Sequence, residues 1–513
     1  MIEYYIVKYQ KFLKYHKFHY VLLFLCLSAH AEPWIDSSNL FLRENIQHLV
    51  DAGYITTPVT TFPLMWFDIA QDLKKIPYFK LNQSEIDAYN YIQHQLQLAK
   101  RNQTRIKATF ATEDNRFASF GDTYRAKNSF TIHNSFMSDT FALNLSPSYN
   151  VSPTKDDEKH FDGSYLAGFW GNWVISVGKQ DRWWGPGWDS NLGLTNNAKP
   201  IPAIAISRKS AAPFSVPFTE ISIPWTVTSF MGVMDDNRVI KDTLLWGFRL
   251  NFIPIPNLEI GITRLAQWGG KGRPKGSSTF WNVFIGKDNC GAGGLECLAD
   301  GSQEPGNQQA GYDFRYSFSL LDTAFGLYGQ SIAEDGNDNS SFSFLTEVQS
   351  QIGMDVRINL FETSSTFFVE YADTYTDCVD EDTIDVGNCF YEHHIYQTGM
   401  RYEQRTLGNL YDNDASSLVF GLISNISSNT RMTIKLRNLR LNKDNSDKNS
   451  ESLIIGNPLT KYAENTTMLS TKVQHSYRNW RYTVGLDISQ STFKNAIADK
   501  KKANLFLSVE YNL

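Results

Sequence analysis

The sequence predicts a mainly β fold, a transmembrane antiparallel β-barrel of about 18 strands preceded by a small α-helical periplasmic domain. From about Arg105 to Leu513, apolar and polar residues alternate with a period of two. Charged residues recur on the face opposite an aromatic-rich face, as expected for lipid outside and a polar lumen. No segment after the N-terminal region is apolar enough for a membrane helix, so a spanning chain would have to form a closed barrel.

Residues 1–31 have the pattern of a secretory signal peptide. Four lysines up to Lys17 precede the apolar run Val21 to Leu27, and Ala29-His30-Ala31 has the small-x-small form of a cleavage site. The mature chain should therefore begin at Glu32. Removing the signal takes the formal net charge from −6 to −9 with neutral histidines. An acidic chain without a long basic tract excludes an electrostatic case for nucleic acid as a partner.

Residues 32–103 are predicted to form a helical domain on the periplasmic side of the barrel. Their apolar residues recur with helical spacing in three runs. Ser37 or Ser38 is expected to cap the first helix, Pro63 to occupy the first position of the second, and Ser84 to start the third.

Residues 104–513 are predicted to form the barrel. The clearest strand is Trp480 to Ser489, where large apolar residues alternate with polar ones. At roughly 22–25 residues per strand and loop, this segment holds about 16 to 18 strands. The final alternating run reaches Leu513 and resembles the C-terminal signal that the barrel-insertion machinery of Gram-negative outer membranes reads.

Loop lengths predict which ends of the strands face outward. Short turns at Ser427–Asn429 and Tyr477–Asn479 should be periplasmic, which puts Leu441–Glu464 and Ser491–Lys502 outside. Counting back from these turns conflicts with placing a cysteine-containing loop outside. The conflict arises when every alternating run between residues 391 and 417 is counted as a barrel strand. At least one of these runs is therefore misread as a strand.

The most distinctive stretch runs from Gly178 to Pro202, GKQDRWWGPGWDSNLGLTNNAKPIP. It follows an alternating strand and holds three tryptophans around Gly185-Pro186-Gly187. The structural interpretation is that the tryptophans pack an inward-folded loop or sit at a membrane interface. The alternative is a stacking surface for sugar rings, with polar neighbours bonding hydroxyls. The candidate residues for either role are Asp181, Arg182, Trp183, Trp184, Trp188, Asp189 and Asn191.

We favour the structural role for this stretch. Trp184 and Trp188 are expected to pack a loop that turns inward, while most sugar contact comes from the outer loops.

The stretch also resembles the signature of the Wzi-type capsule assembly family of outer-membrane proteins. Further matches, in the family's order, are AQWGGKGRP (Ala266 to Pro274), PGNQQAGYDFR (Pro305 to Arg315) and HHIYQTGMRY (His393 to Tyr402). The resemblance covers nearly the whole mature chain. It implies an eighteen-stranded barrel and a surface lectin that binds exported polysaccharide and supports capsule attachment.

No nucleophile elbow, P-loop, dinucleotide fingerprint or HExxH motif occurs. Asp181 and Asp189 could form a glycosidase pair only at a defined separation, and His393-His394 on a strand would point to opposite faces. We therefore predict no catalytic residue, metal or cofactor. The expected partners are capsular or other exported polysaccharide, outer-membrane lipid and the barrel-insertion machinery, with a monomeric state. A diffusion porin and a structural barrel without ligand are the alternative functions.

Four cysteines of the mature chain are predicted to form two local disulfides, Cys290–Cys297 and Cys378–Cys389. Each pair lies in a Gly- or Asp-rich stretch that contains no histidine, and the spacings are not those of zinc motifs. Mass mapping of non-reduced peptides should find these two links. Free thiols, or links between the two stretches, would contradict the prediction.

Overall fold

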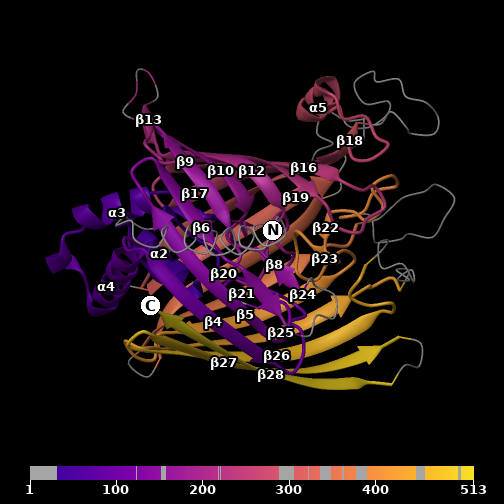
Figure 1. Ribbon diagram of the computed structural model, residues 1–513. Helices are drawn as coiled ribbons and strands as arrows, with labels where there is room; N and C mark the ends of the chain where they lie inside the picture. The colour runs from indigo at the N-terminus through magenta and orange to yellow at the C-terminus, as the bar shows by residue number, and fades with distance from the viewer. Residues whose placement is uncertain are drawn as a thin grey trace, which may run out of the picture.

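A computed structural model describes residues 32–122, 124–151, 158–215, 217, 219, 221–287, 305–321, 323–334, 348–360, 363–376, 390–445, 457–494 and 498–513. The predicted signal peptide and the four cysteines of the predicted disulfides lie outside the described residues. The described chain forms a closed antiparallel barrel with its N-terminal helices gathered at one end (Figure 1).

The strand segments of the barrel are β4 (Gln103–Ala111), β5 (Ser129–Met137), β6 (Phe141–Leu145), β7 (Ser148–Asn150), β8 (Lys159–His160), β9 (Tyr165–Trp170), β10 (Trp173–Lys179), β12 (Pro202–Arg208), β15 (Trp225–Met234), β16 (Thr243–Ile255), β17 (Leu258–Trp268), β18 (Gly306–Leu320), β19 (Thr323–Glu334), β20 (Val348–Leu360), β21 (Thr363–Asp373), β24 (Ser416–Ser424), β25 (Thr430–Leu441), β26 (Glu464–Tyr477), β27 (Trp480–Phe493) and β28 (Lys500–Asn512). β28 pairs with β4 and closes the ring. β6 and β7 both pair with β5, then with β9 and β8 respectively. Within the described residues, these interruptions reduce twenty segments to eighteen strands, which confirms the predicted fold class.

Side chains alternate between the two faces of the wall as predicted. On β27, Trp480, Val484 and Ile488 are 40%, 47% and 49% exposed on the outer face. On β18, Asp313 and Arg315 point inward and are buried. Arg249 pairs with Asp313 at 2.6 Å inside the barrel. The outer face therefore suits lipid, and the lumen is a polar interior whose charges are paired.

The two ends of the barrel differ in the length of their connections. Residues 256–257, 425–429 and 478–479 make short turns at the end that also holds the C-terminus. Most of the longer connections lie at the opposite end, called here the loop end. The connection between β12 and β15, residues 209–224, is an exception, because it joins these strands at the end with the short turns, called here the turn end. β21 ends there at Asp373 and pairs directly with β24, which begins at Ser416. The described chain between β21 and Ser416 therefore adds no strand to the barrel wall. This removes the conflict over which loops face outward.

Short paired segments and a surface helix complete the described structure. They are β1 (Trp34–Ile35) with β3 (Leu64–Met65), β2 (Thr61–Phe62) with β11 (Trp183–Trp184), β13 (Phe214–Ser215) with β14 (Ser222–Ile223), β22 (Arg401–Tyr402) with β23 (Arg405–Thr406), and α5 (Ser277–Phe284).

The N-terminal helices are α2 (Leu40–Asp51), α3 (Trp66–Lys75) and α4 (Gln83–Ala99), with a short 3-10 turn, η2 (Tyr78–Lys80). Their starts differ from the predicted positions. Asn39 caps α2 in place of the two serines, because its side chain accepts a hydrogen bond from Leu42 N at 3.0 Å. Asn82 caps α4 in a capping box with Glu85.

The second helix begins at Trp66 and not at Pro63. Thr61 and Phe62 are extended because they pair with β11 inside the barrel. This long-range pairing overrides the local preference of proline for the first helical turn. None of the helices in the described ranges has the length and apolarity required to cross a membrane.

Helix α2 is buried on all sides from Leu40 to Leu49 and docks inside the turn end of the barrel. Glu44 pairs with Arg357 of β20 at 2.6 Å, and Asp51 with Arg315 at 3.2 Å. A helix with a polar face can be buried there because the surrounding wall is also polar and pairs its charges.

Deleting Val509 to Leu513 should prevent assembly. Val509 pairs with Tyr482 on one side and Ala108 on the other, so the deletion leaves two edges of the wall unpaired in lipid. Outer-membrane fractions should then lack the heat-modifiable band of the folded barrel on a gel. Leu513→Ala, which keeps the ladder, is the control. A truncated protein that still shows the heat-modifiable band would contradict this role for β28.

Candidate functional site

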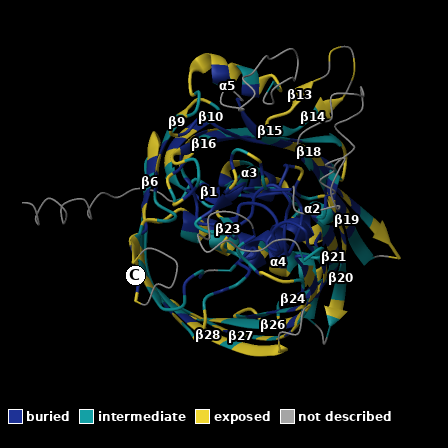
Figure 2. Cartoon of the chain, turned by 90° about the vertical axis from the view of Figure 1, so that its right-hand side faces the viewer, coloured by how far each residue is buried: buried dark blue, intermediate teal, exposed yellow. Residues whose placement is uncertain are grey.

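The stretch between β10 and β12 crosses the interior of the barrel. It leaves the wall at the loop end, and residues 183–201 are buried without interruption. Figure 2, which looks along the barrel, shows buried chain across the lumen. We call residues 180–201 the inner segment. Its contacts reach α2 and the strands β2, β19, β20, β21 and β25.

Two glycines let the inner segment fold tightly on itself. Gly185 has φ +136, and a Cβ there would lie 2.4 Å from Asn191 Oδ1. A Cβ on Gly187 would lie 1.9 Å from Ser190 O. Asn191 Oδ1 accepts a hydrogen bond from Gly187 N at 3.0 Å. Asn191 therefore holds the turn, and its amide is occupied inside the protein.

Trp188 is fixed by carboxylates that project from the wall. Its backbone N donates to Glu370 at 2.8 Å, and its indole Nε1 donates to Asp355 at 2.9 Å. Glu370 also accepts from Ser190 N at 2.9 Å. The Trp188 ring stacks against Phe368, with centroids 6.3 Å apart. The ring is thus held by polar contacts at its edge and apolar contacts on its faces.

Trp183 and Trp184 are also buried, with an exposed fraction of 0% each. Trp183 packs edge-on against Phe120 at 5.3 Å, and Trp184 against Phe230 at 5.5 Å. The guanidinium of Arg43, from α2, lies 4.4 Å from the Trp188 ring centroid. Arg43 also donates to Pro186 O at 2.7 Å, so α2 and the inner segment pack as one unit.

Asp189 is the electrostatic centre of the inner segment. Its fully buried carboxylate lies 2.7 Å from Arg437 Nη2 and 2.9 Å from Lys435 Nζ, both on β25. The Tyr411 hydroxyl donates to the same carboxylate. Burial by itself would raise the pKa of Asp189, but Arg437 and Lys435 outweigh it and hold the pKa well below its usual range. Asp189 is thus a buried anion that cancels positive charge on the wall.

Asp181 and Arg182 lie at the edge of the inner segment and are partly exposed. Asp181 pairs with Arg125 at 2.6 Å. Arg182 lies 4.2 Å over the Phe230 ring and donates to Gln180 O. The two aspartates considered as a glycosidase pair are therefore engaged by different cations.

A second segment, residues 390–415, also enters the barrel from the loop end and packs on the first. Thr195 N donates to Leu407 O at 2.7 Å, and the Tyr391 hydroxyl donates to Leu192 O at 2.6 Å. His393 Nδ1 accepts from backbone N atoms of its own turn. Among the described residues, no cluster of three or more metal-ligating side chains is found.

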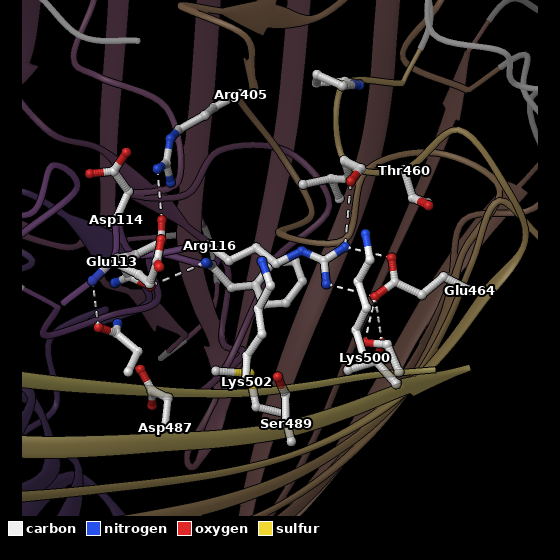
Figure 3. A pocket seen from close by; sticks show the side chains of 18 of the residues that line it. Glu113, Asp114, Arg116, Arg405, Thr460, Glu464, Asp487, Ser489, Lys500 and Lys502 are labelled. Atoms are coloured by element: carbon white, nitrogen blue, oxygen red, sulfur yellow. Dashed lines mark hydrogen bonds and ion pairs between the residues drawn. The ribbon is translucent and has the colours of Figure 1, made fainter. Parts of the chain in front are cut away.

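An open cavity of about 550 Å³ remains at the loop end, beside these two segments. We call it the outer cavity; Figure 3 shows it from close by. Its lining residues are Glu113, Asp114, Asn115, Arg116, Phe117, Glu403, Gln404, Arg405, Pro458, Leu459, Thr460, Lys461, Tyr462, Glu464, Thr466, Met468, Asp487, Ser489, Ser491, Phe493, Lys500, Lys502 and Asn504. They come from the connection after β4, the β22–β23 hairpin, the connection before β26, and strands β26, β27 and β28.

The outer cavity has a fixed polar base. Arg116 forms a bidentate pair with Glu464, both contacts being 2.8 Å. Glu464 also accepts from Thr466 at 2.7 Å and Ser491 at 2.8 Å. Arg405 donates to Asn115 O at 2.7 Å. These contacts set planar polar groups in place before any ligand arrives, which lowers the entropy lost on binding.

None of the outer-cavity residues is among the seven sequence candidates. They come from connections and strands far apart in the chain, so no contiguous motif marks them. One signal was present: continuing the alternation of Leu505 and Leu507 backward puts Lys500 and Lys502 on the inner face.

Asp189→Asn should destabilise the barrel by about 3–5 kcal/mol, because it leaves Lys435 and Arg437 without their buried counter-charge. Thermal unfolding of the purified protein in micelles measures the loss. Asp181→Asn makes the same chemical change at a partly exposed pair and should cost less than about 1 kcal/mol.

The pH dependence has a defined sign. Because the pKa of Asp189 is lowered in the folded state, the stability that its carboxylate contributes is present above the pKa of the unfolded state. This contribution is lost as pH falls through the pKa of the folded state.

Equal losses of stability in Asp189→Asn and Asp181→Asn would contradict the central role of Asp189.

Comparison with known proteins supplies independent findings. A family model described as capsule assembly protein Wzi matches residues 97–505. An uncharacterized 55.8 kDa protein from the cps region of Klebsiella pneumoniae is 28% identical over 307 residues, which are 57% of this chain and 57% of that relative. The match thus spans a little over half the length of this curated relative.

Solved structures also match this chain. The Escherichia coli protein Wzi, described as an outer membrane protein involved in group 1 capsule assembly and a carbohydrate-binding β-barrel, matches with a TM-score of 0.76 at 22% identity, over 94% of this chain and 98% of that one. The outer membrane protein OprD of Pseudomonas aeruginosa matches with a TM-score of 0.44 at 10% identity, over 80% and 92% of the two chains.

The structural likeness at this level of identity establishes a shared barrel architecture. A closed barrel with an apolar outer face and a polar interior places the protein in the outer membrane. The family model covers most of the chain. The chain belongs to the Wzi family of capsule assembly proteins.

Proposed function

We propose that this protein binds exported polysaccharide in the outer cavity and so helps to attach capsule at the cell surface. The observation that carries the proposal is the outer cavity itself, which is open at the loop end and lined by both charged and aromatic side chains. The orientation follows from the loop lengths, with the short turns and the N-terminal helices on the periplasmic side.

The chemistry of the lining suits a sugar polymer. Arg116 and Arg405 bring planar guanidinium groups to the lining, and Tyr462, 39% exposed, offers a ring face. Sugar rings present hydroxyls at their edges and C–H groups on their faces, so they need both kinds of group. The exposed Lys502 adds a cation for sugars that carry a carboxylate.

A binding role is better supported than the two alternatives. A diffusion porin needs an open lumen, whereas residues 183–201 lie buried across this one. An enzymatic role would need reactive groups free to act, and Asp189 is held in ion pairs. We therefore propose a non-catalytic, monomeric binding protein in which the inner segment is the scaffold.

Modest affinity at one cavity is sufficient for this function. A capsular polymer repeats the same unit many times, and many copies of the protein lie in one membrane. Simultaneous contacts then raise the overall strength of attachment without any new contact at a single site. We also propose that residues 1–31 are a signal peptide, that residues 32–103 form the helical domain, and that residues 104–513 form the barrel.

The test measures binding of short oligosaccharides from an acidic capsular polysaccharide to purified protein in micelles, so that avidity does not mask single-site effects. Tyr462→Ala should weaken binding roughly fivefold, the equivalent of about 1 kcal/mol for one ring contact. Lys500→Gln with Lys502→Gln should weaken it roughly tenfold through lost contacts to carboxylates.

Lys501→Gln is the matched control, because Lys501 lies between the two lysines on the opposite face of β28 and does not line the cavity. Its binding should be unchanged. Unaltered binding by the cavity variants, together with loss of binding by normally folded Trp188→Ala, would move the site to the inner segment.

A further inference from the structure

Helix α5 lies outside the barrel wall at the loop end, next to β16 and β17 (Figures 1 and 2). Its Phe280 packs on Trp246 and Trp268, with ring centroids 5.8 Å and 5.2 Å apart. Both tryptophans face outward on the wall, yet each is only 6% exposed. In a membrane barrel such rings form the aromatic girdle at the lipid–water boundary. Here α5 covers part of that girdle.

The helix replaces the covered rings with apolar groups of its own. Trp281, Phe284 and Ile285 are 59%, 42% and 46% exposed. The wall beside them carries Ile262 and Tyr312 on the same outer face, 43% and 47% exposed. The exposed apolar surface of α5 is therefore continuous with the surface that faces lipid. An amphipathic helix in this position lies in the plane of the interface.

An arginine on the lipid side of the wall fixes α5 in place. Arg264 of β17 donates to the carbonyls of Val283 and Phe284, both at 2.6 Å, and to Gln308 on β18. These carbonyls belong to the last turn of α5, where the helix dipole favours a cation. The charge of Arg264 is tolerated on the lipid-facing side of the wall because the carbonyls at the C-terminal end of α5 accept its hydrogen bonds.

Positive charge surrounds the exposed rings. Residues 269–287 contain four basic residues, Lys271, Arg273, Lys275 and Lys287, and no acidic residue. The backbone contact from Lys271 N to Lys241 O, at 2.7 Å, brings a fifth basic residue to the same rim. Lys241, Lys271 and Lys275 are exposed, with Asp242 as the exposed carboxylate of the adjoining turn. The excess of positive charge is local, because the whole chain is acidic.

We propose that α5 and its flanking lysines form a binding site for the phosphate groups and acyl chains of a phosphorylated glycolipid in the outer leaflet. Exposed rings at the lipid boundary take the acyl chains, and the lysines above them take the phosphates. A symmetric dimer through this face would bring the same lysines of two copies against each other, so the charge pattern favours this occupant over a second copy. The site lies outside the barrel wall and is separate from the outer cavity, so it does not depend on the polysaccharide proposal.

The test titrates the purified protein in micelles with diphosphorylated lipid A and detects the complex by native mass spectrometry. Lys271→Gln with Lys275→Gln should weaken binding roughly 25-fold, since each basic residue near anionic lipid contributes about fivefold. Trp281→Ala should weaken it by a smaller factor. Lys74→Gln with Lys80→Gln removes the same charge from exposed positions on the N-terminal helices and should change nothing.

Two further probes separate the sources of binding. Fully dephosphorylated lipid A should bind much more weakly, and inorganic phosphate at matched concentration should not displace the lipid. Equal binding of the dephosphorylated lipid, or no effect of the lysine variants, would overturn the proposal. A dimer that Trp281→Ala abolishes would also overturn it, because a second copy would then cover α5.

Discussion

The buried contact between Asp189 and the cations Arg437 and Lys435 shows the constraint on which the rest of the interior depends. A closed barrel that alternates apolar and polar residues necessarily directs charged side chains inward. In an open pore, water would solvate them. Here chain fills the lumen, so each inward charge needs a partner from the filling segments or from a neighbouring strand. Asp189 neutralises the two cations of β25 in this way.

The same constraint explains the other contacts of the inner segment. Glu370 lies on the wall without an ion pair among the described residues, and three consecutive backbone N–H groups, at Trp188, Asp189 and Ser190, point at it. Arg315 is satisfied by Asp355 from the wall and Asp51 from α2. The wall pairs its charges with both α2 and the inner segment, so removing either one leaves charged side chains of the wall without their partners.

The most distinctive motif of the sequence lies in the buried inner segment, whereas the proposed ligand site is the outer cavity. The tryptophans of the inner segment are the largest fully buried side chains of the protein, alongside several from the segment at residues 390–415. Their rings fill space between α2 and the wall. A larger open polar cavity, of about 550 Å³, is the outer cavity, whose base is fixed by Arg116 and Glu464.

The sequence by itself determined the strands, because a two-residue period over about four hundred residues is typical of strands. Alternation alone also fits a soluble β-sandwich, and the prediction of a barrel rested on charged residues that recur opposite an aromatic-rich face, such as the face bearing Trp480, Val484 and Ile488. The sequence also determined that Gly185-Pro186-Gly187 is a tight turn. Local pattern did not determine the segment at residues 390–415, whose conformation depends on partners such as Leu192. Nor did it determine the start of α3, because the pairing of Thr61 with Trp184 is formed only in the folded barrel.

Only the tertiary structure decided the burial and the ion-pair partner of each charged residue. Asp181 and Asp189 are equivalent in the sequence, yet one is a partly exposed partner of Arg125 and the other a buried anion between two cations. The outer cavity gathers side chains from three connections and three strands, so no single stretch contains its pattern. The physical reason is that burial and charge pairing depend on distances in space, and periodicity specifies only which face of the wall a residue occupies.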